Sequence, residues 1–325
     1  MERILGIGNA LTDVLVILKD DKILQDMGLP KGGMTHIDED TYLRIQEFFS
    51  KTTTSITVGG SAGNMCRAMA HLGMKSAFIG KVGADSIGAN YARSLTRVGI
   101  EERMIVSETL PSGVCCAFIT PDGERTFADY MGASLALAAE ELTPQMMRGY
   151  DYLYLEGYLV QNHALIERAA ILAKEAGLKI VMDVASYNII LSDKDFVRHL
   201  IEKYVDVVFA NEEEAKALTD KEPEEALHEL AQKTEMAVVK IGAHGSLIQQ
   251  GTAYIRVPAV QVEQVVDTTS AGDHFAAGFL YGLLSGQPMK RCAEIGAIVA
   301  AAAIQVVGTE IPENQWEIIR KDITN

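Results

Sequence analysis

The sequence predicts an α/β protein, in which helices cover both faces of a central, mostly parallel sheet and a small second sheet is inserted into that body. Three features support this fold class. Short β-branched runs alternate with longer amphipathic stretches, several of these stretches end at a glycine, and four runs break the alternation at two places in the chain.

Seven short runs have the composition of buried strands, and amphipathic helices are expected between them. The expected strands are residues 3–8, 55–58, 76–82, 152–156, 179–183, 207–210 and 237–241. Asp38 can cap a helix that runs to Phe49, and three further helices end where Gly73, Gly99 and Gly177 supply a left-handed C-cap. This alternation implies parallel strands joined by right-handed crossovers.

Four other runs predict the small second sheet, which we expect to be antiparallel. Residues 14–18 and 33–37 lie early in the chain, and residues 113–120 and 125–129 flank a Pro-Asp-Gly turn that predicts a hairpin. Its apolar residues suggest a covered face, which could cover a ligand or a partner subunit, or be a packed flap without a moving part. The body would then comprise 1–12, 38–110 and 132–325, and the small sheet 13–37 and 111–131.

The charge balance excludes some classes of partner. The 325 residues include 29 Lys and Arg against 44 Asp and Glu, a net charge of −15. Such a chain offers no counter-charge to nucleic acid or an anionic membrane, so neither is an expected partner. Four cysteines without a CxxC pair, and a first segment without the apolar region of a signal peptide, favour a reduced, cytoplasmic protein. The longest apolar stretch, 295–307, is too short to span a bilayer.

Two familiar nucleotide-binding motifs are missing. The only Gly-Lys pair, Gly80-Lys81, is followed by valine, so there is no GxxxxGK[ST] loop. The run after the first strand starts like a dinucleotide fingerprint but has Leu11 where the third glycine belongs. A nicotinamide-dependent oxidoreductase is therefore a weak alternative. Metal-spaced Cys/His clusters are also absent from the sequence.

The segment that points most directly to chemistry is a polar turn, 267–272, which opens into the apolar helix 275–284. Small residues there let amide N–H groups face a ligand, and a helix N-terminus carries unpaired donors and partial positive charge. This arrangement suits a transferring phosphoryl group. Asp273, in the first helical turn, could take a proton from a neighbouring hydroxyl or could simply cap the helix.

Two earlier segments could hold the molecule that carries this hydroxyl. Gly59 and Gly60 follow a strand and allow close backbone approach, and Asn64 offers a donor and an acceptor to hydroxyl groups. Asp13 follows the first strand and could accept hydrogen bonds from a vicinal diol. A purely structural role in a turn is the alternative for each residue.

These segments together resemble the PfkB carbohydrate kinase family, which includes ribokinase, fructokinase and adenosine kinase. Gly59-Gly-Ser-Ala-Gly-Asn64 is similar to its N-terminal signature, and Asp267-Thr-Thr-Ser-Ala-Gly-Asp273 to its C-terminal one. Asn211-Glu-Glu-Glu214 resembles the family's NxxE motif, and residues 240–245 resemble its nucleotide-side glycine strand. The resemblance implies a ribokinase-like three-layer α/β/α fold, in which the inserted β-sheet is a lid.

The resemblance also implies roles for individual residues. Asp273 would be the catalytic base, with Ala271 and Gly272 in a backbone anion hole. The acceptor would contact Asn9, Asp13, Gly59, Gly60 and Asn64. The ATP side would comprise Asn211, Glu214, Lys240, Gly242, Gly245 and Ser270. Glu214 would hold Mg²⁺ through water, and some members bind a K⁺ ion at the positions of Asp267 and Thr269.

The implied reaction is ATP-dependent phosphorylation of a primary hydroxyl on a sugar or nucleoside. The opening after the first strand, and the lack of an arginine in the run 183–188, favour the adenosine-kinase-like branch. Ser270 stands where the family signature usually has glycine, and it would be strained if that position needs a positive φ. A non-catalytic sugar or nucleoside sensor on the same fold is the alternative. A homodimer through the lid is a further expectation.

Overall fold

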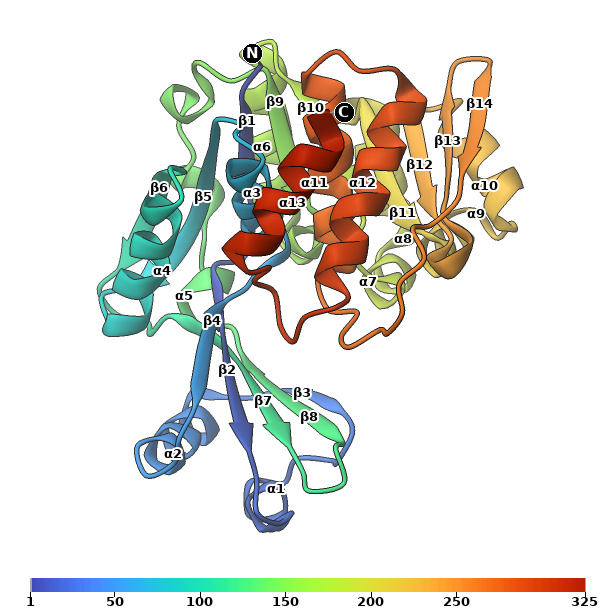
Figure 1. Ribbon diagram of the computed structural model, residues 1–325. Helices are drawn as coiled ribbons and strands as arrows, with labels where there is room; N and C mark the ends of the chain where they lie inside the picture. The colour runs from blue at the N-terminus through green and yellow to red at the C-terminus, as the bar shows by residue number, and fades with distance from the viewer. Residues whose placement is uncertain (1, 325) are drawn as a thin grey trace.

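The computed structural model describes residues 2–324 and contains, within that range, a large and a small sheet (Figure 1). From edge to edge the large sheet comprises β14 (Ala253–Val257), β13 (Ser246–Gln250), β12 (Met236–Lys240), β11 (Val207–Asn211), β10 (Lys179–Asp183), β9 (Tyr152–Glu156), β1 (Ile4–Ile7), β5 (Ser76–Gly83) and β6 (Glu101–Ser107). Neighbouring strands are parallel except at the β12–β13 and β13–β14 pairs. The predicted α/β class is confirmed.

Helices cover both faces of the large sheet, and each face has its own hydrophobic core. One face is covered by α3 (Ser61–His71), α4 (Ser86–Arg97), α11 (Ala271–Leu284), α12 (Met289–Ala303) and α13 (Glu313–Thr324). The other is covered by α6 (His163–Glu175), α7 (Tyr187–Ser192), α8 (Lys194–Tyr204), α9 (Glu212–Thr219) and α10 (Pro223–Leu230). Burial on both faces explains why the central strands are almost continuously apolar.

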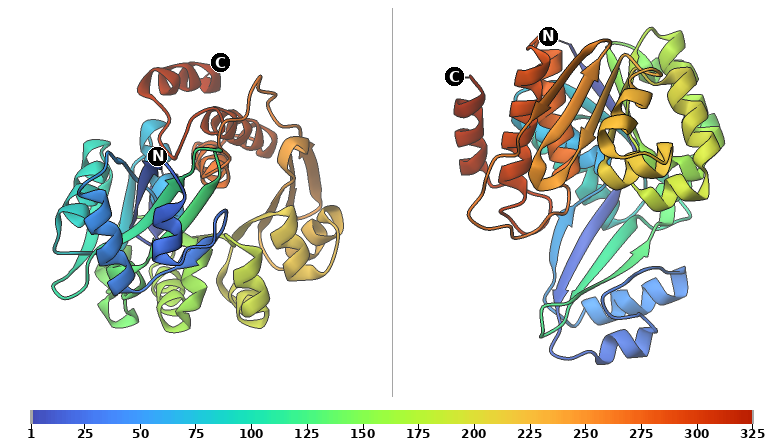
Figure 2. Two further views of the ribbon diagram at one scale, coloured as in Figure 1. Left: turned by 90° about the horizontal axis from the view of Figure 1, so that it is seen from below. Right: turned by 90° about the vertical axis from the view of Figure 1, so that its right-hand side faces the viewer.

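The small sheet projects from one end of this body (Figures 1 and 2). It comprises β3 (Met34–His36), β8 (Arg125–Tyr130), β7 (Gly113–Ile119), β2 (Leu11–Ile17) and β4 (Ser55–Val58). The predicted hairpin is present as the antiparallel β7–β8 pair. The prediction of a purely antiparallel sheet is wrong, because β2–β7 and β3–β8 are parallel pairs.

Two elements that we assigned to the body lie with the small sheet. Strand β4, expected in the parallel sheet, pairs antiparallel with β2, and α2 (Glu39–Phe49) packs on the small sheet through Tyr42 and Ile45. The boundary placed at residue 38 therefore does not match the packing. A four-residue apolar run before a glycine and a helix looks the same in either sheet, since only the pairing register distinguishes them.

The apolar face of the small sheet is covered by helices of the same chain. Val14, Val16 and Phe118 are buried with residues of α2 and of α1 (Lys22–Met27). Tyr130 stacks on Tyr42 with ring centroids 4.4 Å apart. This face is therefore not available to a partner subunit, and it gives no support to the expected homodimer.

The topology places a candidate site at the carboxyl end of β1. β1 lies between β5 and β9, so the strand order runs outward from it in both directions. Open α/β sheets bind ligands at such a switch point, outside the carboxyl ends of the strands. The small sheet begins four residues after β1 and projects from this end. Between residues 2 and 324, none of the helices is both long and apolar enough to cross a membrane.

Candidate active site

The start of α11 has the character of an anion site. Ser270 is the N-cap residue and has φ 60° and ψ 6°, in the left-handed region that favours glycine. The Ala271 amide donates to the Thr268 carbonyl at 3.2 Å, whereas the structure shows no partner for the amides of Gly272 and Asp273. The predicted backbone donors thus reduce to two, at the positive end of a 14-residue helix.

Asp273 connects this helix to the start of α3. Its carboxylate accepts hydrogen bonds from the Ser61 hydroxyl at 2.6 Å and from Asn64 Nδ2 at 2.8 Å. Burial raises the pKa of Asp273 to about 6, although these two hydrogen bonds act in the opposite direction. The carboxylate therefore lies beside the Gly59–Asn64 segment, as the sequence predicts, and does more than cap its own helix.

The two glycines before α3 leave room for neighbouring groups of the chain. Gly60 has φ 82°, and a Cβ there would lie 2.2 Å from the carbonyl oxygen of Asn9. A Cβ on Gly59 would lie 2.6 Å from the Asp13 carboxylate. Burial raises the pKa of Asp13 to about 7, while Arg67 opposes this shift. Four of the five predicted acceptor-side positions, Asn9, Asp13, Gly59 and Gly60, are thus brought together.

Glu156 joins the segment after β1 to the start of α3, and the sequence analysis did not predict it. Its carboxylate accepts from the Asn9 amide at 3.2 Å, from Asn9 Nδ2 at 3.0 Å and from the Ala62 amide at 2.9 Å. Burial raises the pKa of Glu156 to about 7. The available signal was an acidic residue at the end of the otherwise apolar strand β9, since a carboxylate is seldom buried there without partners.

On the opposite side of α11, Lys240 lies beside the anion site. A Cβ on Gly272 would lie 3.1 Å from Lys240 Nζ, which also pairs with Asp183 at 2.8 Å. Burial alone would lower the pKa of Lys240, but Asp183 and Glu214 outweigh it and raise the pKa. The ammonium is therefore charged. Asp183 is a second residue that the sequence analysis did not assign to the site.

Asn211 and Glu214 bind each other in a capping box at the start of α9. The Glu214 carboxylate accepts from the Asn211 amide and from Asn211 Nδ2, both at 2.7 Å, and the Glu214 amide donates to Asn211 Oδ1 at 2.8 Å. Burial raises the pKa of Glu214 to about 7, against the effect of Lys240. Each carboxylate oxygen accepts one hydrogen bond and keeps a further acceptor site, so Glu214 could contact a metal ion directly or through water.

Gly242 and Gly245, which follow β12, differ in whether packing requires a glycine. Gly245 has φ 98°, and a Cβ there would lie 2.0 Å from the Val257 carbonyl oxygen, so packing alone requires glycine. Gly242 has φ 55°, and a Cβ there would meet no other atom within 4 Å, which leaves its surface open at the carboxyl end of β12. Of these two glycines, only Gly242 is free to lie against a ligand.

The side chain of Asp267 anchors the turn before α11 and ties it to the small sheet. It accepts from the amides of Thr269 at 3.0 Å and Gly308 at 2.9 Å, and it pairs with Arg125 Nη1 of β8 at 3.0 Å. Burial alone would raise the pKa of Asp267, but these hydrogen bonds outweigh it and lower the pKa to about 2. The Arg125 side chain thus spans from the small sheet to the turn that precedes α11.

Comparison with known proteins decides the family. A family model described as pfkB family carbohydrate kinase matches residues 40–316. The chain belongs to this family. It is a phosphotransferase that acts on a hydroxyl group of a sugar or nucleoside, and the family resemblance inferred from the motifs is confirmed.

Relatives of this pfkB family kinase carry several names. The crystal structure of an adenosine kinase from Sinorhizobium meliloti has 32% identity and a TM-score of 0.86, with 99% of each chain covered. An adenosine kinase of Schizophyllum commune is 27% identical over 97% of each chain. An ATP-dependent ribose-1-phosphate kinase of Halopiger xanaduensis is 31% identical over 73% of this chain and 76% of its own length.

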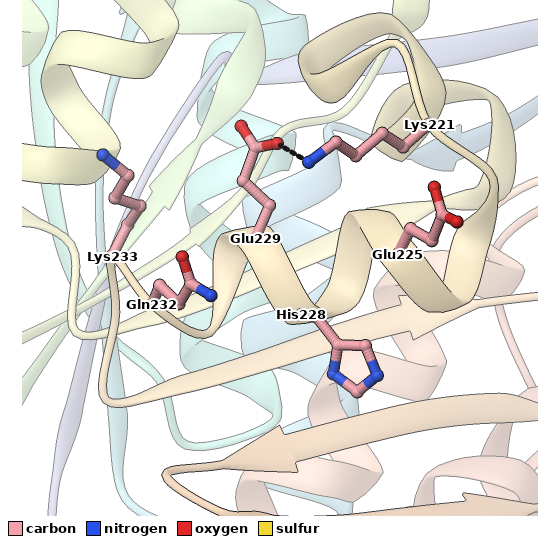
Figure 3. A pocket seen from close by; sticks show the side chains of 6 residues that line it. All are labelled: Lys221, Glu225, His228, Glu229, Gln232 and Lys233. Carbon is pink, nitrogen blue, oxygen red and sulfur yellow. Dashed lines mark ion pairs between the residues drawn. The ribbon is translucent and has the colours of Figure 1, made fainter.

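Two hollows of the kinase are not lined by Asp273 itself. One, of about 480 Å³, opens along α10, where Lys221 and Glu229 form an ion pair at 2.8 Å (Figure 3). The other, of about 680 Å³, lies behind the site between α3, α4 and α13 and is lined in part by Asn64, Arg67 and His274. No group of three His, Cys, Asp or Glu side chains that could hold a metal ion occurs within residues 2–324.

Proposed function

We propose that this kinase transfers the γ-phosphoryl group of ATP to a primary hydroxyl of a nucleoside, with adenosine as the leading acceptor. One observation carries the proposal: the Asp273 carboxylate lies at the amide-lined start of α11 and is held by two residues of α3. The relatives named adenosine kinase, at 27% and 32% identity over nearly the whole chain, support the choice of acceptor. A sugar is the other acceptor class within the family.

The acceptor side of the reaction rests on Asp13, Asn64 and Asp273. Asp13 accepts hydrogen bonds from hydroxyls of the acceptor, and Asn64 fixes the orientation of Asp273. Asp273 takes the proton as the acceptor oxygen forms a bond to the γ-phosphorus. The bond from the γ-phosphorus to the β–γ bridging oxygen breaks, and ADP leaves with that electron pair. The amides of Gly272 and Asp273 stabilise charge on the phosphoryl oxygens.

The ATP side rests on Lys240, Gly242 and Ser270, which lie around the start of α11 and the end of β12. Lys240 supplies a fixed positive charge next to Gly272. The donor set fits Mg²⁺ bound mostly to phosphates and water, because the buried carboxylates Glu214 and Asp183 lie there without a group of three metal-ligating side chains in the described residues. Glu214 would hold Mg²⁺ through water, and the ion would supply neutralisation of phosphate charge. A K⁺ ion at the carbonyls of Asp267 and Thr269 is a further element of the proposal.

The small sheet would act as the lid of this site. It carries Asp13 and Arg125, and the Arg125–Asp267 pair holds it against the turn before α11. A closed lid excludes water, which would otherwise compete with the acceptor hydroxyl for the phosphoryl group.

Acceptor-dependent ADP formation tests this function. The purified protein with Mg-ATP would be given adenosine, ribose, fructose, ribose 1-phosphate or 2-keto-3-deoxygluconate, and ADP release would be followed in a coupled assay. We expect the highest kcat/KM with adenosine. A higher value with any sugar would reject the nucleoside assignment, and ADP formation that no acceptor stimulates would reject transfer to this class of hydroxyl.

A further inference from the structure

A row of polar side chains crosses the small sheet on the face opposite α1 and α2. The strand register aligns His36 of β3, Asp129 of β8, Cys115 of β7, Asp13 of β2 and Thr57 of β4. Directly paired residues project to the same side of a sheet, so these five side chains share one face. One row thus runs through all five strands and includes the acceptor residue Asp13.

This face is turned toward the active site. Neighbours of Asp129 along β8, Ala128 and Tyr130, are buried with α2 on the other face, and alternation therefore places Asp129 on the face with Asp13. Asp13 lies against Gly59 at the start of α3, and Arg125 of the same face reaches Asp267. The row therefore starts beside the site at Asp13 and continues across the strands of the lid to Asp129.

One oxygen of the buried Asp129 carboxyl has no hydrogen-bond partner. The residue is 7% exposed, and its Oδ1 atom is inaccessible and has no hydrogen-bond partner. Burial raises the pKa of Asp129, while the Cys115 thiol and His36 beside it act to lower the pKa. No lysine or arginine within residues 2–324 forms an ion pair with it. A buried carboxyl oxygen that lacks a donor is costly, and such groups in native proteins call for a specific explanation.

The next row along the lid is apolar. Leu15, Ala117, Phe127 and Met34 are paired across β2, β7, β8 and β3 on the same face. An apolar row therefore adjoins Asp129 on the same face of the small sheet. Adjacent strands lie about 4.8 Å apart, so the backbones of Asp13 and Asp129, which are two strands apart, are separated by about 10 Å across the sheet. A molecule that contacts both is longer than a single sugar ring.

We propose that Asp129 is a specificity-determining residue, which accepts a hydrogen bond from an N–H or O–H group at the end of the acceptor remote from the transferred phosphoryl group. The inference rests on the proposed function and narrows its substrate class. An amino-substituted base on a ribose supplies both the flat ring and the donor. An acceptor that places a phosphate or carboxylate beside Asp129 and Asp13 is disfavoured by repulsion wherever either carboxyl is ionised.

Binding of adenosine and of purine riboside, which lacks only the exocyclic amino group, tests the proposal without catalysis. Calorimetric titration in the absence of ATP would be made with the wild-type protein, Asp129→Leu and Asp129→Asn. We expect the wild type to bind adenosine roughly 10- to 100-fold more tightly than purine riboside, because the amine-free ligand leaves the acceptor unpaired. In Asp129→Leu that ratio should fall to about 1–3.

A control variant and a stability measurement separate the proposed role of Asp129 from a loss of folding. Glu124→Gln, an exposed carboxylate of the same hairpin, should retain the wild-type ratio. Asp129→Asn preserves size and removes the buried charge, so its melting temperature should equal or exceed that of the wild type, and its ratio should lie below the wild-type ratio. The proposal is overturned if the wild type binds neither ligand, if it binds both equally, or if both Asp129 variants keep the wild-type ratio. Tight adenosine binding without ADP formation would reject the proposed reaction and leave Asp129 in its role.

Discussion

At the scale of the residue, Asp273 shows how opposing local effects set a protonation state suited to a base. Burial disfavours its charged form, whereas the hydrogen bonds from Ser61 and Asn64 favour it. The resulting pKa of about 6 leaves the carboxylate mostly ionised at neutral pH. A base with a pKa near the working pH can both take a proton and release it afterward.

This pKa predicts an acid limit on activity. The proposed reaction requires ionised Asp273, so kcat/KM with the best acceptor should fall as the pH is lowered through the range from 7 to 5. Asp13, whose pKa is raised to about 7, titrates in the same range and should make the fall steeper than tenfold per pH unit. The measurement is a pH–rate profile, with a denaturation curve at each pH to show that the protein stays folded. A rate that is constant down to pH 5 would contradict the assignment of Asp273 as the base.

The site residues that could be predicted from the sequence belong to short motifs of neighbouring positions. Asp273, Gly60 and Asn64 follow strands or turns in short motifs, and the structure brings them together. Glu156, Asp183 and Asp129 could not be found in this way. Each is a single acidic residue at or near the end of a strand, and its role depends on partners more than 50 positions away or on a cross-strand register.

At the scale of the element, the start of α11 stores backbone strain. Ser270 has φ 60°, which costs a residue with a Cβ about 1–2 kcal/mol, and its buried hydroxyl has no hydrogen-bond partner. The strain anticipated for a serine at this glycine position of the signature is therefore present. It is compensated by the rest of the turn, where Asp267 accepts from two amides.

Ser270→Gly should therefore increase the free energy of unfolding by about 1 kcal/mol, because glycine adopts a positive φ without steric cost. Ser285→Gly at the other end of α11 is the matched control, since its hydroxyl is also buried without a partner but its φ is −91°. The control should show no gain. Equal effects of the two substitutions in denaturant titrations would show that φ is not the cause.

The helices and strands could be predicted where the spacing of apolar residues and the positions of the glycines indicate the same element. The parallel strands and the helices that end at Gly73, Gly99 and Gly177 follow the expected pattern. Strand β4 was assigned to the wrong sheet because its four residues are compatible with either. The parallel β2–β7 pair was missed for the same reason, since the two strands are separated by nearly 100 residues and no local signal fixes their pairing.

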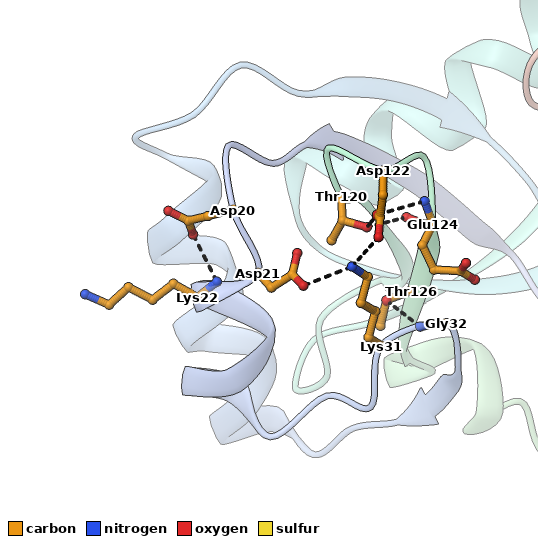
Figure 4. A network of polar contacts seen from close by, with 9 residues as sticks. All are labelled: Asp20, Asp21, Lys22, Lys31, Gly32, Thr120, Asp122, Glu124 and Thr126. Atoms are coloured by element: carbon orange, nitrogen blue, oxygen red, sulfur yellow. Dashed lines mark hydrogen bonds and ion pairs between the residues drawn. The ribbon is translucent and has the colours of Figure 1, made fainter.

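At the scale of the whole molecule, two kinds of ion pair hold the small sheet. Lys31 contacts Asp21 at 2.9 Å and Asp122 at 2.7 Å within the small-sheet unit (Figure 4). The Arg125–Asp267 pair instead joins this unit to the body, and Asp267 is nearly buried. Loss of the second pair should free the lid, whereas loss of the first should not.

Arg125→Gln should accordingly accelerate hydrogen exchange of the β7 and β8 amides by about tenfold, since a partly buried, charge-assisted hydrogen bond contributes about 1–2 kcal/mol. The ratio of acceptor-independent ATP hydrolysis to phosphoryl transfer should rise as well, because water gains access to the site. Lys31→Gln is the control and should leave both quantities near the wild-type values. Unchanged exchange in Arg125→Gln would show that the pair does not hold the lid closed.

The turnover number of Asp273→Asn in the acceptor-dependent assay tests the proposed mechanism most directly. The substitution keeps the size of the side chain and removes its ability to take a proton. We expect kcat to fall by roughly 10²- to 10⁴-fold, the usual contribution of a general base, while the affinity for ATP changes little. A kcat within a few-fold of the wild-type value would contradict the role of Asp273, and with it the proposed mechanism.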